Sequence, residues 1–245
     1  MKKAGIGLVG VGGWGGQGVK ALADSDVLEL VSWYDSNPEA VESVRSQLPV
    51  PPAGSYEEIL SDPAVDGVLL IVPNHVHADL AVQAAGCGKH VWIEKPLANT
   101  LEECDRIIRA CEEAGVVLSV DHSIRRQPCA RLTKKLIEEG AIGDLVALEG
   151  HQSHRGGWDL TPDRWRWYAD KCPGGPLNVL GVHQFDTAHY FAGPSVEVTG
   201  MFAKKYRPYE AEEMGAVVIR YESGLLGTVL STYLTPGRTF MSVYG

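Results

Sequence analysis

Short apolar runs alternate with amphipathic stretches along the first half of the chain. The runs AGIGLVG, LELVSWYD, VDGVLLIV, HVWIE and VVLSV have the length and composition of buried strands. The stretches between them, at residues 13–24, 38–47, 76–86 and 100–114, have the pattern of helices. Strands and helices that alternate in this way form a parallel sheet covered on both faces. The pattern predicts a doubly wound α/β domain over residues 1–122.

The stretch 100–114 shows the helical pattern most completely. Thr100 and Glu103 have the spacing of a capping box, and Gly115 stands where a helix commonly ends. One face of this helix is expected to carry Leu101, Cys104, Ile107, Ile108 and Cys111.

After residue 122 the pattern changes. Pro128 opens a helical stretch that closes at Gly140, and DLVALEGHQ reads as a strand. Residues 155–177 are rich in Gly, Pro and Trp, which is typical of a loop. A second helix is expected over residues 178–191.

Three further strand-like runs follow, EVTGMFAKKY, EMGAVVIRY and LLGTVLSTYL. Glu222-Ser223-Gly224 is expected to join the last two as a hairpin. Residues 123–245 are therefore predicted to form an α+β domain with an open, mainly antiparallel sheet. The sequence stops at MSVYG, in or at the end of a strand, so we expect this domain to be incomplete.

Composition narrows the class of protein. The chain has 245 residues, 44% of them apolar, and a formal charge of −9 without a run of Lys or Arg, which argues against nucleic acid as a partner. The five cysteines are odd in number and lack C-x-x-C spacing, as in a reducing compartment. No run approaches the ~18 apolar residues of a membrane span, and no signal-peptide pattern opens the chain. We therefore expect a cytoplasmic protein without a membrane partner.

A glycine motif follows the first predicted strand. Gly10, Gly12 and Gly15 give G-x-G-x-x-G, with Gly13 and Trp14 inside it, and the motif opens a helix. The first glycine permits a tight turn, the second lets a pyrophosphate approach the backbone, and the third lets helix and strand pack closely. The helix N-terminus supplies N–H donors to the phosphates. The motif predicts a Rossmann domain that binds a dinucleotide.

An acid supports this interpretation. Asp35 ends the next predicted strand about 20 residues on, where a carboxylate accepts hydrogen bonds from both ribose hydroxyls. Ser36 and Asn37 follow it, with no arginine beside them to neutralise a 2′-phosphate. NAD is therefore favoured over NADP, although Arg45 could reach the site from the next helix.

A lysine lies at the end of another predicted strand. Lys95 comes directly before Pro96, which restricts it to extended backbone. Ligands of doubly wound sheets bind beyond the carboxyl ends of the strands. The stretch 72–77, Val-Pro-Asn-His-Val-His, ends the preceding strand in the same way and brings more polar side chains to that edge.

Together these motifs resemble the Gfo/Idh/MocA oxidoreductases, the group of glucose-fructose oxidoreductase and inositol dehydrogenase. The resemblance rests on the glycine loop, Pro73-Asn74 with His77, the run GKHVWIEKPL, and the run GGPLNVLGVHQFD. It covers nearly the whole chain and is strongest over residues 4–122 and 174–191. Glu94-Lys95-Pro96 is its most specific element.

The resemblance implies hydride transfer between a nicotinamide and a secondary alcohol of a sugar, polyol or cyclitol. It implies Lys95 and His183 as catalytic residues, and an open second sheet that mediates contacts in a homo-oligomer. The cofactor-binding candidates are Gly10, Gly12, Gly13, Trp14, Gly15, Asp35, Pro73, Asn74, His77, Glu94 and Lys95. The substrate-binding candidates are Lys95, Asp121, Arg125, Trp165, His183 and Asp186.

The chemistry agrees with these roles. Oxidation of an alcohol removes the O–H proton as hydride leaves carbon, and an imidazole accepts protons near neutral pH. A nearby ammonium group stabilises the developing alkoxide.

One position departs from the family pattern. Members commonly carry an Asp four residues before the histidine, and this chain has Val179 there. Asn178, five residues before His183, would point well away in a regular α-helix. Three alternatives stay open: Lys95 and His183 suffice, another polar group such as Asp186, Asp121 or His122 takes the place, or the activity has weakened.

Two other groups of residues are candidates for a role. The ring pair of His151 and His154 would face opposite sides of a strand, so we expect no metal site among these and the other histidines, His183 and His189. The aromatic and basic residues near Trp165 suit either a sugar ring or the packing of a loop.

The sequence thus predicts an NAD-dependent dehydrogenase. Two rivals remain: a hydrolase or lyase that oxidises its sugar transiently, and a non-catalytic NAD-binding protein. The sequence does not identify the substrate.

Overall fold

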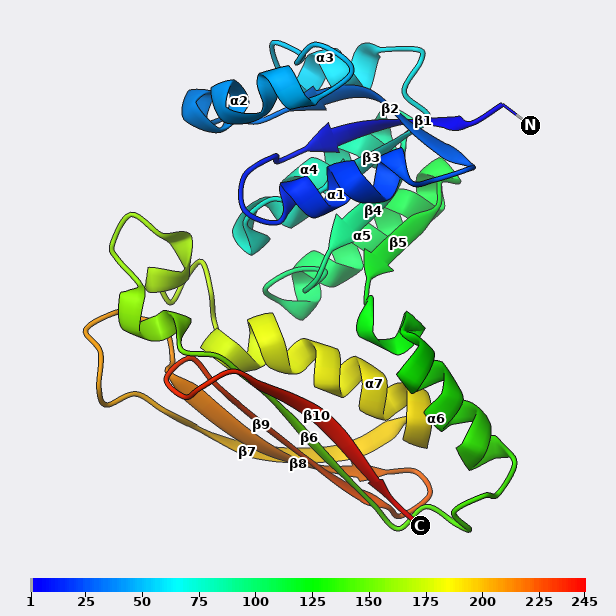
Figure 1. The fold of residues 1–245 in the computed structure, drawn as a ribbon, viewed down its shortest axis with the longest axis vertical. Helices are drawn as coiled ribbons and strands as arrows, with labels where there is room; N and C mark the ends of the chain where they lie inside the picture. Colours follow the sequence, from blue (N-terminus) through cyan, green and yellow to red (C-terminus); the bar gives the residue numbers. More distant parts are fainter. Residues whose placement is uncertain (1) are drawn as a thin grey trace. The chain divides into compact units, whose positions relative to one another are not determined.

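The computed structural model describes residues 2–245 and divides into two compact units, with the boundary along the chain between Asp121 and His122 (Figure 1). Unit 1 contains a five-stranded parallel sheet in the order β2-β1-β3-β4-β5. Its strands are β1 (Ala4–Val9), β2 (Leu28–Tyr34), β3 (Gly67–Leu70), β4 (His90–Glu94) and β5 (Leu118–Asp121). Its helices are α1 (Gly15–Ala23), α2 (Pro38–Val44), α3 (Tyr56–Ser61), α4 (His77–Gly86) and α5 (Leu101–Ala114), with short 3₁₀ turns η1 (Arg45–Gln47) and η2 (Asn74–Val76).

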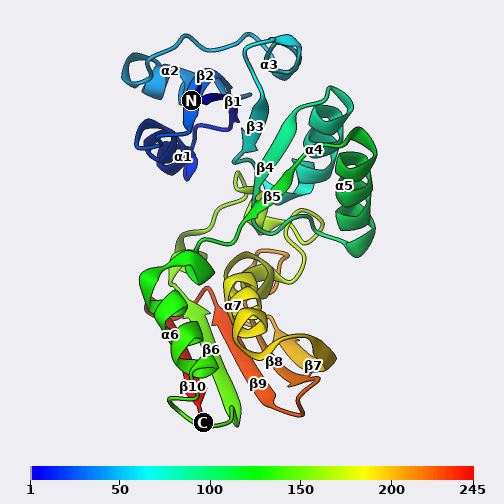
Figure 2. The same ribbon diagram turned by 90° about the vertical axis from the view of Figure 1, so that its right-hand side faces the viewer.

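Apolar clusters cover both faces of this sheet. On one face Leu8 and Trp33 pack with Leu22 of α1. On the other face the strands pack against α3, α4 and α5, and Ile107 of α5 is fully buried there. Figure 2 shows α1 on one side of the sheet and α4 and α5 on the other. The predicted doubly wound α/β sheet is confirmed.

Local signals explain where two of the helices start. In α5 the Thr100 side chain accepts from the Glu103 N–H, the Glu103 side chain accepts in return, and Gly115 ends the helix with φ 66°. Helix α3 was not predicted from the sequence, although its cap has a recognisable signal. The Ser55 side chain accepts from the Glu58 N–H, which is the S-x-x-E spacing of a helix start.

Unit 2 contains a second five-stranded sheet, in the order β10-β6-β9-β8-β7. Its strands are β6 (Ala147–Ser153), β7 (Ser195–Ala203), β8 (Met214–Tyr221), β9 (Leu226–Thr232) and β10 (Arg238–Tyr244). The pair β6 and β9 is parallel, and the other three pairs are antiparallel. The expected mainly antiparallel sheet is confirmed, and residues 241–244 of the MSVYG run end its edge strand β10.

Helices α6 (Pro128–Glu138) and α7 (Val182–Ala192) cover one face of this second sheet (Figures 1 and 2). Ala188 and Phe191 of α7 pack there against Leu148, Ile219 and Val229 of the strands. The remaining turns are η3 (Ile124–Arg126), η4 (Gly156–Asp159), η5 (Trp165–Trp167) and η6 (Leu177–Gly181).

The opposite face of the second sheet keeps apolar side chains in contact with solvent. Strand register places Met201, Val218 and Leu230 on this face, and they are 79%, 42% and 41% exposed. Patches of this kind commonly mark binding surfaces.

The turn before α7 is not a regular α-helix. Residues Leu177–Gly181 form a π-helix, with hydrogen bonds from residue i to i+5. The prediction of one continuous α-helix over residues 178–191 is therefore wrong in its first turn. Because Asn178 lies in this π-helix, its direction relative to His183 does not follow from α-helical winding.

Among residues 2–245, no helix is both long enough and apolar enough to cross a membrane.

Candidate active site

The candidate residues of unit 1 gather at one edge of its sheet. Gly10 and Asp35 directly follow β1 and β2, Pro73 follows β3, Lys95 follows β4, and Asp121 ends β5. All five positions lie at carboxyl ends of parallel strands, which is where doubly wound sheets bind their ligands.

The glycine loop is shaped by contacts that exclude a side chain. Gly10 has φ +90°, and a Cβ there would lie 2.1 Å from the Ile71 carbonyl oxygen. A Cβ on Gly15 would lie 2.5 Å from the Gly10 carbonyl oxygen, so α1 packs directly on the turn. Gly12, Gly13 and Trp14 are exposed, and Trp14 makes no side-chain cap at the N-terminus of α1. The loop therefore presents backbone and a helix start to a ligand.

Asp35 ties the second strand to this loop. Its Oδ2 accepts from the N–H of Val11 at 2.9 Å and from that of Gly12 at 3.3 Å. Its Oδ1 accepts from the Asn37 N–H at 2.8 Å. A carboxylate offers about four acceptor positions, so these bonds leave it able to accept from a ribose hydroxyl.

Asn74 carries a buried donor that lacks an acceptor. It lies in η2 behind Pro73 and is 5% exposed. Within residues 2–245 its Nδ2 has no hydrogen-bond partner. Buried donors rarely stay unpaired, so a ligand oxygen at this edge would complete the bonding of Asn74. Together with the glycine loop and Asp35, this orphaned donor fits a dinucleotide.

His77 is fully buried and contacts the two loops that follow β3 and β4. Its Nδ1 is 2.9 Å from the Pro96 carbonyl oxygen, and its Nε2 is 3.0 Å from that of Val72. Burial lowers the pKa of this imidazole, which outweighs the opposing effect of the backbone carbonyl groups.

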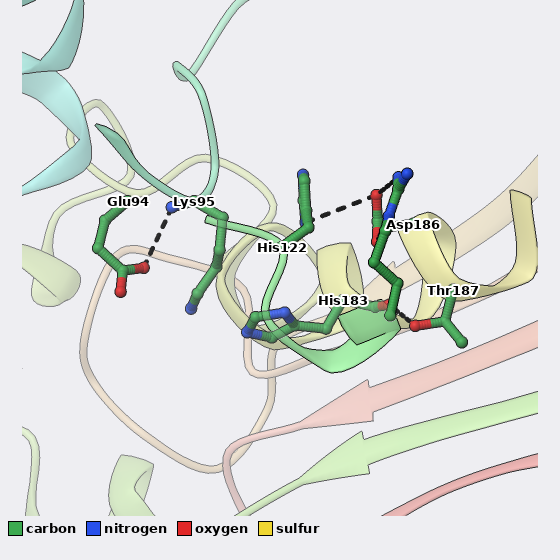
Figure 3. Close-up of polar contacts among 7 residues, drawn as sticks. Glu94, Lys95, His122, His183, Asp186 and Thr187 are labelled. Atoms are coloured by element: carbon green, nitrogen blue, oxygen red, sulfur yellow. Dashed lines mark hydrogen bonds and ion pairs between the residues drawn. The ribbon is translucent and has the colours of Figure 1, made fainter. Parts of the chain in front are cut away.

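Glu94 and Lys95 stand at the end of β4, where the Lys95-Pro96 peptide is cis. The Lys95 N–H donates to Glu94 Oε2 at 3.1 Å (Figure 3). Glu94 is paired in register with Asp121 of β5, and a hydrogen bond joins their carboxyl groups. Burial raises the pKa of Glu94; the Lys95 ammonium opposes this shift and Asp121 adds to it. This acid pair was not predicted from the sequence, although both acids end neighbouring strands.

In unit 2, His183 lies in the first turn of α7 and is 8% exposed (Figure 3). Its carbonyl oxygen accepts from the Thr187 hydroxyl at 2.8 Å. The ring of His122 meets the His183 ring edge-on, with centroids 6.3 Å apart. From the sequence, His122 was expected only as one possible replacement for the missing acid.

Asp186 faces Arg125 and His122. Arg125 Nε donates to Asp186 Oδ2 at 2.6 Å, and its terminal NH2 group donates to the other carboxylate oxygen. His122 Nδ1 lies 3.8 Å from Asp186 Oδ1. Two substrate-binding candidates, Arg125 and Asp186, are thus engaged with each other.

The Trp-rich segment packs within unit 2. Trp165 and Trp167 lie against an apolar cluster that includes Val179, Cys172, Tyr209, Ala211 and Tyr233. The Arg166 guanidinium stacks 4.3 Å above the Trp165 ring. Val179, at the position of the family's acid, belongs to this apolar cluster.

The other histidines make local contacts. His151 Nε2 lies 2.8 Å from the Ser153 hydroxyl, and the His154 ring stacks on Tyr233. In residues 2–245 no three His, Cys, Asp or Glu side chains are grouped as metal ligands.

Two family models match the chain. Residues 4–122 match an oxidoreductase family with an NAD-binding Rossmann fold, and residues 130–245 match the GFO/IDH/MocA C-terminal domain. The chain belongs to the GFO/IDH/MocA family. The resemblance inferred from Glu94-Lys95-Pro96 and the glycine loop is thereby confirmed.

Three relatives illustrate the similarity. Levoglucosan dehydrogenase of Pseudarthrobacter phenanthrenivorans is 31% identical over 83% of this chain and 59% of its own length. The 2,7-anhydro-N-acetylneuraminate hydratase of Escherichia coli is 28% identical over 91% of this chain and 60% of its own. The WlbA dehydrogenase of Bordetella pertussis, solved with NADH and UDP-GlcNAcA, is 31% identical with a TM-score of 0.92, covering 100% of this chain and 72% of that one. The chain thus spans only part of the length of its relatives.

Proposed function

We propose that this protein is an NAD-dependent dehydrogenase that transfers hydride between a secondary alcohol of a sugar, polyol or cyclitol and the nicotinamide. One observation carries the proposal: Lys95 follows β4 at the edge where the glycine loop follows β1. A cation at the edge that holds the dinucleotide suits a hydroxyl-bearing substrate. The similarity to levoglucosan dehydrogenase supports the substrate class.

In this proposal residues 1–122 bind the coenzyme and residues 123–245 bind the substrate. Bound NAD would accept the hydride. His183 takes the hydroxyl proton as the carbonyl forms, and the Lys95 ammonium stabilises the developing negative charge on oxygen. Asp35 and Asn74 hold the ribose hydroxyls, and the glycine loop holds the phosphates.

A second candidate is a lyase or hydratase that oxidises its sugar transiently. The similarity to the 2,7-anhydro-N-acetylneuraminate hydratase favours it. Such an enzyme keeps its coenzyme bound and releases no net NADH. A third candidate, an NAD-binding protein without catalysis, is favoured by Val179 in place of the family's acid.

Absorbance near 340 nm separates the three candidates. The full chain is incubated with NAD and a panel of sugars, polyols and cyclitols. A dehydrogenase accumulates NADH, and Lys95→Ala lowers kcat by roughly 100-fold or more. Product without net NADH identifies the second candidate, and NAD binding without product from any substrate identifies the third. A His189→Ala variant, changed at an exposed position of α7, is the matched control and should keep the wild-type activity.

The exposed apolar face of the second sheet supports a homo-oligomer. We propose that a second copy of the chain covers it. The five cysteines are all free thiols, which supports residence in the cytoplasm.

A further inference from the structure

His77 joins two loops that follow neighbouring strands. It is the first residue of α4, and its side chain is fully buried. Nδ1 lies 2.9 Å from the Pro96 carbonyl oxygen and 3.3 Å from that of Leu97, both in the loop that follows β4. Nε2 lies 3.0 Å from the Val72 carbonyl oxygen in the loop that follows β3.

Each of these loops carries a residue of the candidate site. Pro96 directly follows Lys95, and Val72 lies two residues before Asn74. The imidazole therefore connects the loop that carries Lys95 with the loop that carries Asn74. Since both ring nitrogens face backbone oxygens, the side chain has no nitrogen directed at a ligand.

The proton of the ring has two possible places. A neutral imidazole donates from one nitrogen only, and burial keeps this ring neutral near pH 7. A protonated Nδ1 can donate to the carbonyl groups of Pro96 and Leu97, whereas a protonated Nε2 can donate only to that of Val72. The Nδ1–H form satisfies more acceptors.

We propose that His77 is a positioning residue that donates from Nδ1 to the Pro96 carbonyl and thereby fixes Lys95 for its reaction. The inference rests on the proposed dehydrogenase function only for its kinetic consequence. The hydrogen bond itself belongs to unit 1 and can be measured without turnover.

Two amide variants, each with a nitrogen near the place of one ring nitrogen, test the direction of the bond. In His77→Asn the amide nitrogen replaces Nδ1, and in His77→Gln it replaces Nε2. We expect His77→Asn to keep kcat within roughly 3-fold of wild type, and His77→Gln to lower kcat by roughly 10- to 100-fold with an unchanged KM for NAD, since a misplaced group costs about that much. Equal kcat values for both variants would overturn the proposal.

Two further measurements need no substrate. Nitrogen chemical shifts of ¹⁵N-histidine-labelled wild type should show the proton of His77 on Nδ1, and a proton on Nε2 overturns the proposal. Hydrogen exchange should speed up in residues 95–99 of His77→Gln, and stay at the wild-type rate in His77→Asn. If the protein passes both tests but turns over no sugar or cyclitol, the hydrogen bond from His77 is supported and the proposed dehydrogenase function is refuted.

Discussion

Arg125 donates two hydrogen bonds to the carboxylate of Asp186, and this pair links turn η3 to helix α7. The Asp186 side chain is only 6% exposed, and that of Arg125 is 37% exposed. Removing Arg125 leaves the buried Asp186 carboxylate without its counter-ion, and removing Asp186 leaves the half-buried guanidinium without its two acceptors.

We expect Arg125→Ala to lower the free energy of unfolding by about 2 kcal/mol, and Asp186→Ala to do the same. Because the two groups interact directly, the double variant should lose much less than the sum. Urea denaturation of the four proteins measures the coupling. Arg220 and Glu197 form an exposed pair on the second sheet and serve as control, with an expected coupling below about 1 kcal/mol. Additive losses at Arg125 and Asp186 would contradict the prediction.

Glu94 should make stability depend on pH. Burial raises the pKa of this carboxyl in the folded protein. In the unfolded chain the same carboxyl has an ordinary pKa near 4.3, so at pH values just above 4.3 the folded protein still holds the proton that the unfolded chain has released. Stability from Glu94 is therefore present at low pH and is lost as pH rises through the raised pKa. In Glu94→Gln this loss should disappear, which thermal unfolding between pH 4 and pH 7 can measure. Glu29→Gln, at an exposed position of β2, should retain the wild-type slope.

Asp35 should carry part of the affinity for the coenzyme. Asp35→Ala removes an acceptor for the ribose and releases the N–H groups of Val11 and Gly12. We expect NADH to bind about 10- to 100-fold more weakly, as for the loss of a charged hydrogen-bond partner. Titration calorimetry measures this, with exposed Asp26→Ala as control. Unchanged NADH affinity would mean that the carboxylate only shapes the loop.

The apolar face of the second sheet should control assembly. Leu230→Glu and Val218→Glu each place a charge on that face, and both residues are more than 40% exposed in the single chain. If a second copy covers the face, burying this charge is unfavourable, and sedimentation should change from oligomer to monomer. Val117→Glu, at a 62% exposed site of unit 1, should leave the oligomer intact. A wild-type monomer refutes the proposed assembly directly.

Local features were predictable from the sequence, and features that depend on partners far along the chain were not. The capping box of Thr100 and Glu103 lies within four residues, so its motif identified the helix start. The pair Arg125 and Asp186 joins positions 61 residues apart, and the pair Glu94 and Asp121 depends on the register of β4 and β5. No local sequence pattern predicts either of these two pairs.

The π-helix before α7 shows the same limit. Periodicity predicts a regular helix there, because the five residues of a single π-helical turn are too few to show a period of their own. A Cβ on Gly181 would lie 3.0 Å from Leu177 and 3.6 Å from Ser231 of β9, so packing against the sheet constrains this turn. The candidate residues of unit 1 were easier to identify, because strand ends are visible in the sequence.

Trp14 gives the glycine loop an optical reporter. Its indole is 65% exposed, beside the backbone that is expected to cradle the phosphates. Reduced coenzyme absorbs where tryptophan emits, so docking at this turn should quench that emission and sensitise coenzyme fluorescence. The difference in emission between wild type and Trp14→Phe isolates the signal of this indole from that of the other tryptophans. The occupancy of the loop in the wild type can then be followed in real time without any substrate.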